Sequence, residues 1–120
     1  MKTEREERLE KIIEELFETV DAIIENREIV NTRLLYAAQN EYFNLVKYLV
    51  EEQNEDINQT DYDNLSAYIL TTITNSLDIV KYFVSKDANA KNILSFAISY
   101  RKLHIIRYTF ETLHAKITEN

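Results

Sequence analysis

Residues 77–84 read LDIVKYFV and residues 43–50 read FNLVKYLV, so the two stretches match in residue type almost position by position. A third stretch, LHIIRYTF at 103–110, follows the second at a shorter offset. Each stretch is preceded by a shorter apolar segment, at 34–38, 68–72 and 94–98. The first two stretches begin 34 residues apart. A repeat of this length with two helices per unit indicates a solenoid of stacked helix pairs. Several pairs are needed because each one buries its apolar face only against its neighbours.

Before the first unit, apolar residues recur at steps of three and four from Leu9 to Ile24, which is the spacing of one face of an α-helix. Thr3 is followed by several acids and provides a capping signal, so we expect a helix from about Thr3 to Glu25. We expect this helix to pack on the units as an N-terminal cap, since terminal units of solenoids are commonly atypical. A free coiled-coil arm or a partner-binding helix is the alternative.

The second unit carries three motifs around its helices, DYDNLSAY at 61–68, NSLDIV at 75–80 and DANA at 87–90. In this order they resemble the ankyrin repeat patterns Asp-x-x-Gly-x-Thr-Pro-Leu, Gly-His-x-x-Ile-Val and Gly-Ala-Asp-Val. In the first unit, residues 56–58 read DIN and are similar to the family's Asp-Val-Asn. The resemblance covers about 32–114 and implies an all-α, ankyrin-like solenoid of about three helix-pair repeats with an N-terminal capping helix.

The resemblance also predicts how the chain is divided. We expect a single domain over residues 1–120, with a helical cap at 1–31, repeat 1 at 32–60, repeat 2 at 61–91, and a shortened repeat 3 with a C-terminal cap at 92–120. The residues missing between the second and third units correspond in length to the family's projecting finger. We therefore expect a tight loop around Asp87–Asn92 in place of that finger.

The chain has no glycine and no proline, which a very AT-rich genome or deliberate engineering would each explain. The glycine that ankyrin repeats place between their two helices is replaced by Glu41, Asn75 and Arg101. If these residues keep a left-handed backbone, each costs roughly 1 kcal/mol, and asparagine costs the least. The missing glycines also exclude phosphate-binding loops, dinucleotide fingerprints and EF-hands.

The composition of the chain excludes several kinds of functional site. With no cysteine and only His104 and His114, we expect no disulfide, no metal site and no cofactor, and no serine lies in a nucleophile motif. An enzyme is therefore not expected. No apolar run approaches the length of a membrane span and no signal peptide is visible at the start, so we expect an intracellular protein without a membrane segment.

The 120 residues include 14 basic and 21 acidic ones, for a net charge of −7, which disfavours nucleic-acid binding and suits a basic partner. Charge is uneven, since residues 1–30 sum to −5 and residues 91–120 to +3. Opposite charges at the two ends allow head-to-tail attraction between copies, and the oligomeric state stays open.

The resemblance implies a non-catalytic module that binds a protein partner through a concave face of finger tips and inner helices. The contact candidates implied in this way are Tyr62, Asp63, Leu65, Ile73 and Thr74 in the second unit, Gln39 and Asn40 in the first, and Ser99 and Tyr100 in the third. Leu65 and Ile73 are expected to be exposed apolar groups, which favour an interface, and extra packing within the fold is the alternative for them. Two alternatives stay open: a small acidic inhibitor or decoy of viral or phage type, and a structural piece of a larger assembly.

The register of the long helices predicts the core. We expect eight residues to be largely buried: Leu45, Val46, Leu49, Ile79, Val80, Phe83, Ile105 and Ile106. Tyr48, Tyr82 and Tyr108 hold equivalent positions and are expected to pack in the core or between units.

Overall fold

The computed structural model describes residues 1–25 and 32–118, and in these residues the chain forms seven helices and no sheet. The helices are Glu4–Glu25 (α1), Arg33–Gln39 (α2), Phe43–Glu51 (α3), Ala67–Ile73 (α4), Leu77–Ser85 (α5), Ala90–Ser99 (α6) and Leu103–Thr118 (α7). A single long helix thus precedes three pairs, each made of a shorter and a longer helix. The all-α class predicted from the sequence is confirmed.

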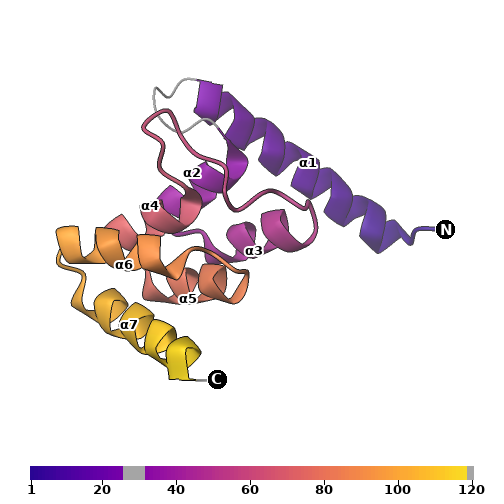
Figure 1. The fold of residues 1–120 in the computed structure, drawn as a ribbon. Coiled ribbons are helices and arrows are strands. Elements are labelled where there is room, and N and C mark those ends of the chain that lie inside the picture. The colour runs from indigo at the N-terminus through magenta and orange to yellow at the C-terminus, as the bar shows by residue number, and fades with distance from the viewer. Residues whose placement is uncertain (26–31, 119–120) are drawn as a thin grey trace.

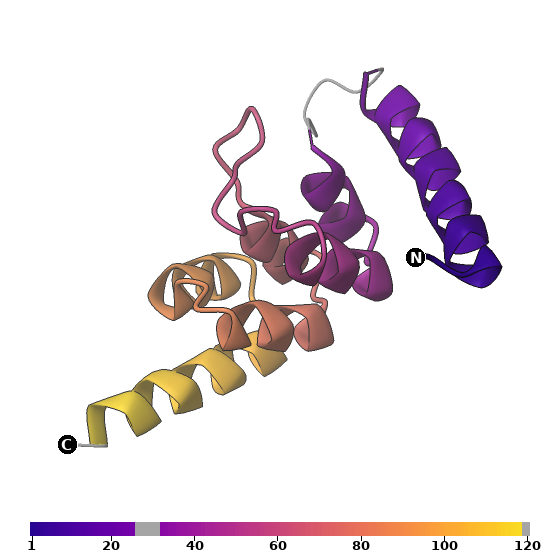
Figure 2. The same ribbon diagram turned by 90° about the vertical axis from the view of Figure 1, so that its right-hand side faces the viewer.

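The three pairs are stacked side by side. The shorter helices form one layer, because α2 packs on α4 and α4 packs on α6. Each longer helix packs against the shorter helix of its own pair, and α5 also contacts α7. In Figures 1 and 2 the stack runs from α1, which contacts α2 at one end, to α7 at the other.

Helix α1 begins where the capping signal predicts. The backbone N–H of Glu6 donates to the Thr3 hydroxyl over 3.1 Å, and the N–H of Glu7 donates to the Thr3 carbonyl over 3.0 Å. Val20 is the buried residue of this helix, and partly buried apolar residues of its C-terminal half, such as Phe17 and Ile24, pack against the core. The apolar residues nearer its start, Leu9 among them, are exposed. Only the second half of α1 therefore acts as a cap.

The turn between the two helices of each pair has the same geometry in all three. Glu41, Asn75 and Arg101 have φ angles of 60°, 63° and 56°, which is the left-handed region. The residue after each of them donates its N–H to the carbonyl of Ala37, Thr71 or Ala97, over 2.8–2.9 Å. The three non-glycine residues thus keep the left-handed backbone, and the repeated hydrogen bond shows what holds it in place.

The loop between α5 and α6 is short, as predicted. Helix α5 ends at Ser85 and α6 already begins at Ala90. Asn89 caps α6, because its side-chain oxygen accepts the backbone N–H of Asn92 over 3.0 Å. No finger projects between the second and third pairs.

Six of the eight predicted core residues are buried. The prediction is wrong for Leu45 and Ile106, which are half-buried and pack at the edge of the core. Each lies in a helix pair at one end of the stack. Within the described residues, the first pair has the single helix α1 on its outer side and the last pair has no helix on its outer side, so Leu45 and Ile106 have less cover.

The three equivalent tyrosines are half-buried and pack between elements. The Tyr48 ring lies 6.2 Å from the Phe17 ring of α1, and the Tyr82 ring lies 5.7 Å from the Phe43 ring of the preceding pair. The Lys81 ammonium group lies 5.4 Å from the centre of the Tyr108 ring. Burial raises the pKa of Tyr82 to about 12. The prediction that these tyrosines pack between units is confirmed.

Candidate protein-binding surface

One long loop, residues 52–66 between α3 and α4, projects from the stack as a finger (Figures 1 and 2). Its two sides are joined by an isolated antiparallel bridge between Thr60 and Ser66. At its base the Tyr68 hydroxyl donates to the Asn58 side-chain oxygen over 3.3 Å. The bridge and this bond connect the finger to the first turn of α4.

Asp61 organises the tip of the finger. It is almost completely buried, and its Oδ1 accepts the backbone N–H groups of Asp63 and Leu65, each over 2.9 Å. Its own N–H donates to the Leu65 carbonyl over 2.9 Å, and its carbonyl accepts the N–H of Asn64. Asn64 adopts a φ of 63°, which asparagine tolerates better than most residues. The tip is therefore a hydrogen-bonded turn with a fixed shape.

The side chains that this turn presents differ in exposure. Tyr62 is 70% exposed, and Asp63 is exposed beside it. Leu65 is half-buried and packs against the core. The expectation that it is an exposed apolar group is therefore wrong. Asp61 bonds to both backbone groups of Leu65 and so holds this residue where its side chain packs against the core. Tyr62 is the apolar side chain that the tip offers to solvent.

The remaining predicted contact residues form a second group, at the C-terminal ends of the short helices. They are Gln39 and Asn40 at the end of α2, Ile73 and Thr74 at the end of α4, and Ser99 and Tyr100 at the end of α6. The finger precedes the first residue of α4 and this group begins at its last, so about 10 Å of helix separates the two sets. The nine candidates therefore form two clusters at opposite ends of the short helices.

Several side chains of this second group have structural partners. The Asn40 amide donates to the Tyr36 carbonyl over 2.9 Å, and the Thr74 hydroxyl donates to the Thr71 carbonyl over 3.2 Å. The Tyr100 ring stacks on the Phe96 ring at 6.5 Å. Ile73 packs against the core, so its expected full exposure is also wrong. These contacts leave less of the second cluster available to a partner than of the finger.

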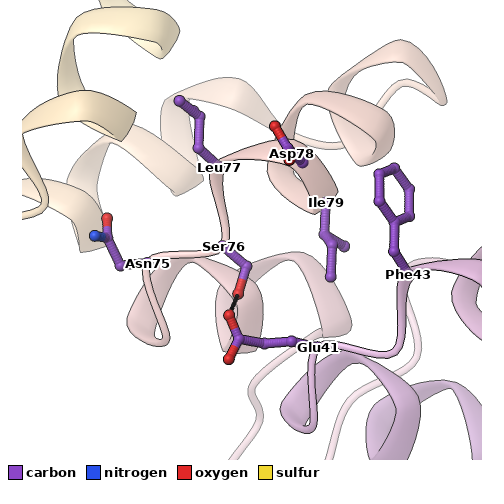
Figure 3. A pocket seen from close by; sticks show the side chains of 7 residues that line it. All are labelled: Glu41, Phe43, Asn75, Ser76, Leu77, Asp78 and Ile79. Atoms are coloured by element: carbon purple, nitrogen blue, oxygen red, sulfur yellow. Dashed lines mark hydrogen bonds between the residues drawn. The ribbon is translucent and has the colours of Figure 1, made fainter.

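A shallow pocket of about 340 Å³ lies beside the second cluster, between the turns of the first and second pairs (Figure 3). Phe43, Leu77 and Ile79 supply apolar surface, while Glu41 and Asp78 supply carboxylates. The Ser76 hydroxyl donates to Glu41 Oε1 over 2.6 Å, which joins the two pairs at this edge. The pocket thus combines apolar walls with acidic groups.

A charged cluster fixes α1 to the stack. The Arg33 guanidinium donates to both carboxylate oxygens of Asp21, over 2.9 Å each, and lies 4.1 Å from the centre of the Phe17 ring. The hydrogen bonds from Arg33 hold the pKa of Asp21 below its usual value. Burial raises the pKa of the nearby Glu55 carboxyl, against the opposing effect of its hydrogen bond with Gln59. The cluster sets the position of α1 relative to the first pair.

Three large exposed apolar side chains at the C-terminal end of the stack were not predicted from the sequence. Ile98, Leu103 and Phe110 are 58%, 75% and 61% exposed. A signal for them exists in the repeat register, since the positions equivalent to Ile98 hold the small residues Ala38 and Thr72. The change from a small to a bulky residue at this position indicates that its surroundings differ from those in the first two repeats.

Neither a metal centre nor a membrane span is found in the part of the chain that the structure describes. Across 1–25 and 32–118, no group of three or more histidine, aspartate or glutamate side chains is arranged to hold a metal ion. Within those ranges no helix combines the length and the apolar character that a membrane span requires.

A family model for ankyrin repeats, in three copies, matches residues 34–120. Searches among curated proteins and among solved structures gave no significant match. Ankyrin repeats generally serve as modules for protein–protein interaction. The three stacked helix pairs, their shared left-handed turns and this match over most of the sequence together show that the chain belongs to the ankyrin repeat family.

Proposed function

We propose that this chain is a non-catalytic module that binds a protein partner, with the finger of the second repeat as the main contact. The observation that carries the proposal is Tyr62, which is 70% exposed at the tip of a turn that buried Asp61 holds in shape. Tyrosine gives a large contact area and has few rotatable bonds, so it loses little entropy when it binds.

The shape of the finger supports the same conclusion. Because the tip is already ordered by Asp61 and by the bridge between Thr60 and Ser66, binding does not have to order it. Preorganisation of this kind increases affinity by reducing the entropic cost of association. Asp63 beside Tyr62 favours a partner with a basic group next to its apolar contact.

The test begins with capture of a partner from an extract of the source cells, followed by titration of that purified partner. Tyr62→Ala is expected to weaken binding about 30-fold, because truncation of an aromatic anchor often costs about 2 kcal/mol or more. Leu65 is kept, since it packs against the core and its loss would confuse binding with folding. Circular dichroism checks that the variant stays folded.

Tyr42→Ala is the matched control, because Tyr42 is also exposed but lies in the turn of the first repeat, away from the finger. It is expected to change the affinity by less than about threefold, as surface substitutions outside an interface usually do. Equal affinity of the Tyr62→Ala variant and the wild-type chain would place the contact elsewhere.

A second candidate function, an acidic inhibitor or decoy, is favoured by α1, which carries nine acids and three bases. A contact made through these charges loses affinity steeply as salt is raised. A contact centred on Tyr62 should change little over the same range, because burial of an apolar ring does not depend on screening. The same titration, repeated at low and high salt, separates the two.

A further inference from the structure

The last repeat has the same register as the first two but leaves different positions uncovered. Counting three residues back from the left-handed turn residue gives Ala38, Thr72 and Ile98 in the three repeats. Ala38 and Thr72 are completely buried, whereas Ile98 is 58% exposed. This position is the one that a following repeat covers in the first two cases.

Two other positions show the same difference. Phe43 and Leu77, two residues after the turn residue, are half-buried, whereas their equivalent Leu103 is 75% exposed. Val50 and Val84 are half-buried, whereas their equivalent Phe110 is 61% exposed. Ile98, Leu103 and Phe110 together form an apolar surface on α6 and α7, named here the C-terminal face. Large exposed apolar groups that lie together indicate an interaction surface.

Helix α1 lies at the other end of the stack (Figure 2) and carries a second set of exposed apolar side chains. Leu9, Ile12 and Leu16 follow one another at helical spacing and are 51%, 60% and 44% exposed. They belong to the same stripe as Val20, which is buried against the stack. The part of α1 before Phe17, called here its first half, therefore carries an apolar face that is about half exposed in the single chain.

The charges around the two surfaces are opposite. Residues 4–16 of α1 carry six acids and three bases, whereas residues 90–118 carry five bases and one acid. Arg101 and Arg107 are exposed beside the C-terminal face. Two apolar surfaces of opposite net charge attract each other, and two copies of either surface repel each other.

We propose that the first half of α1 of one copy docks on the C-terminal face of a second copy, so that the chain associates head to tail. Leu9, Ile12 and Leu16 would cover the side chains that a fourth repeat would otherwise cover. This contact joins two different surfaces, so each copy keeps one surface free and the association can continue into longer assemblies. The finger with Tyr62 belongs to neither surface and stays available to another partner.

The test uses two variants of the full chain, each blocked on one surface with uncharged polar residues. The head variant carries Leu9→Gln and Ile12→Gln, and the tail variant carries Leu103→Gln and Phe110→Gln. Sedimentation velocity at low salt is expected to show concentration-dependent association of the wild-type chain. Each variant alone should associate at least about 30-fold more weakly, since the loss of one anchor at an interface commonly has that effect.

A mixture of the two variants gives the decisive result. The intact C-terminal face of the head variant can bind the intact α1 of the tail variant, so the mixture should form a species of two chains and nothing larger. Its formation also proves that both variants are folded. The association should weaken in about 1 M salt, where the screening length falls to about 3 Å.

Three results would overturn the proposal. One is a wild-type chain that stays monomeric at low salt up to about 1 mM, a concentration at which even weak contacts are visible. Another is a head variant that associates as strongly as the wild-type chain, which would mean that two C-terminal faces bind each other. The third is a mixture that associates no better than the separate variants. Tyr42→Gln, an exposed substitution outside both surfaces, is the control and should associate like the wild-type chain.

Discussion

The middle repeat, α4–α5, and the last repeat, α6–α7, share a residue pattern but differ in how much of it they bury. Thr72 and Val80 of the middle repeat are completely buried, whereas their equivalents Ile98 and Ile106 are exposed and half-buried. The middle repeat has neighbours on both sides, and the last repeat has one on a single side. In a solenoid the pattern specifies which face is apolar, and the neighbour decides whether that face is covered.

The largest effect that this comparison predicts is in the core of the middle repeat. Ile79 is 3% exposed in α5, so Ile79→Ala should reduce the free energy of unfolding by about 2–5 kcal/mol. Phe110→Ala in the last repeat removes a larger side chain but should cost less than about 0.5 kcal/mol, because the ring is mostly exposed. Urea denaturation of both variants in dilute solution measures the two values. A loss below about 0.5 kcal/mol for Ile79→Ala would show that the repeat register is wrong.

The next effect concerns the finger, which the middle repeat has and the last repeat lacks. Asp61→Ala leaves the backbone N–H groups of Asp63 and Leu65 without their acceptor, so the expected loss of stability is about 1–3 kcal/mol. Asp61→Asn is the matched control, because its amide oxygen can accept the same two bonds. Hydrogen exchange at Asp63 and Leu65 should accelerate in Asp61→Ala and stay slow in Asp61→Asn. Slow exchange in both variants would show that Asp61 does not order the tip.

A smaller change in stability is expected at the left-handed turn residues. Arg101 in the last repeat and Asn75 in the middle repeat have nearly the same φ, but asparagine tolerates this region better than arginine. Arg101→Gly should therefore raise the free energy of unfolding by about 0.5–1 kcal/mol, and Asn75→Gly should raise it by less. Thermal or urea unfolding of the two variants compares them. A larger gain at Asn75 than at Arg101 would contradict this reading of the turns.

The smallest expected effect is at the cap, where Asp21 pairs with Arg33. The folded pKa of Asp21 is lowered, so its stabilising contribution is present above the unfolded pKa of about 3.9 and is lost as the pH falls through the folded value. Because the pair is well exposed, Asp21→Asn should cost only about 0.5 kcal/mol at pH 7. The difference between variant and wild type should vanish in acid below the folded pKa. A difference that persists there would assign the effect to packing instead of charge.

Much of the fold could be predicted from the sequence because its determinants are local. The spacing of apolar residues, the Thr3 cap and the register around Arg101 each act within a few residues, and each prediction was confirmed. The exposure of Leu65 and Ile106 could not be predicted in the same way. Leu65 depends on how Asp61 bends the turn, and Ile106 depends on whether another repeat follows. The exposure of each residue depends on which groups lie near it in the folded chain, and the spacing of residues in the sequence does not specify this.

The same limit applies to the candidate site. The resemblance to ankyrin repeats pointed to Tyr62, and the structure places that ring in solvent. The resemblance could not show that the side chains of Asn40 and Thr74 donate hydrogen bonds to helix carbonyls. It also could not show that Ile98 and Leu103 are exposed. These facts depend on the relative positions of whole helices.

Hydrogen exchange of the dilute wild-type chain, resolved by residue, tests the contrast between the two repeats most directly. The amides of residues 80–84 in α5 should exchange slowly, through opening of the whole stack, because the middle repeat is covered on both sides. The equivalent amides at 106–110 in α7 should exchange at least about tenfold faster, since loss of one interface lowers the free energy of local opening. Equal protection of the two segments, or slower exchange in α7, would contradict the claim that neighbours rather than the residue pattern determine how firmly each repeat is held.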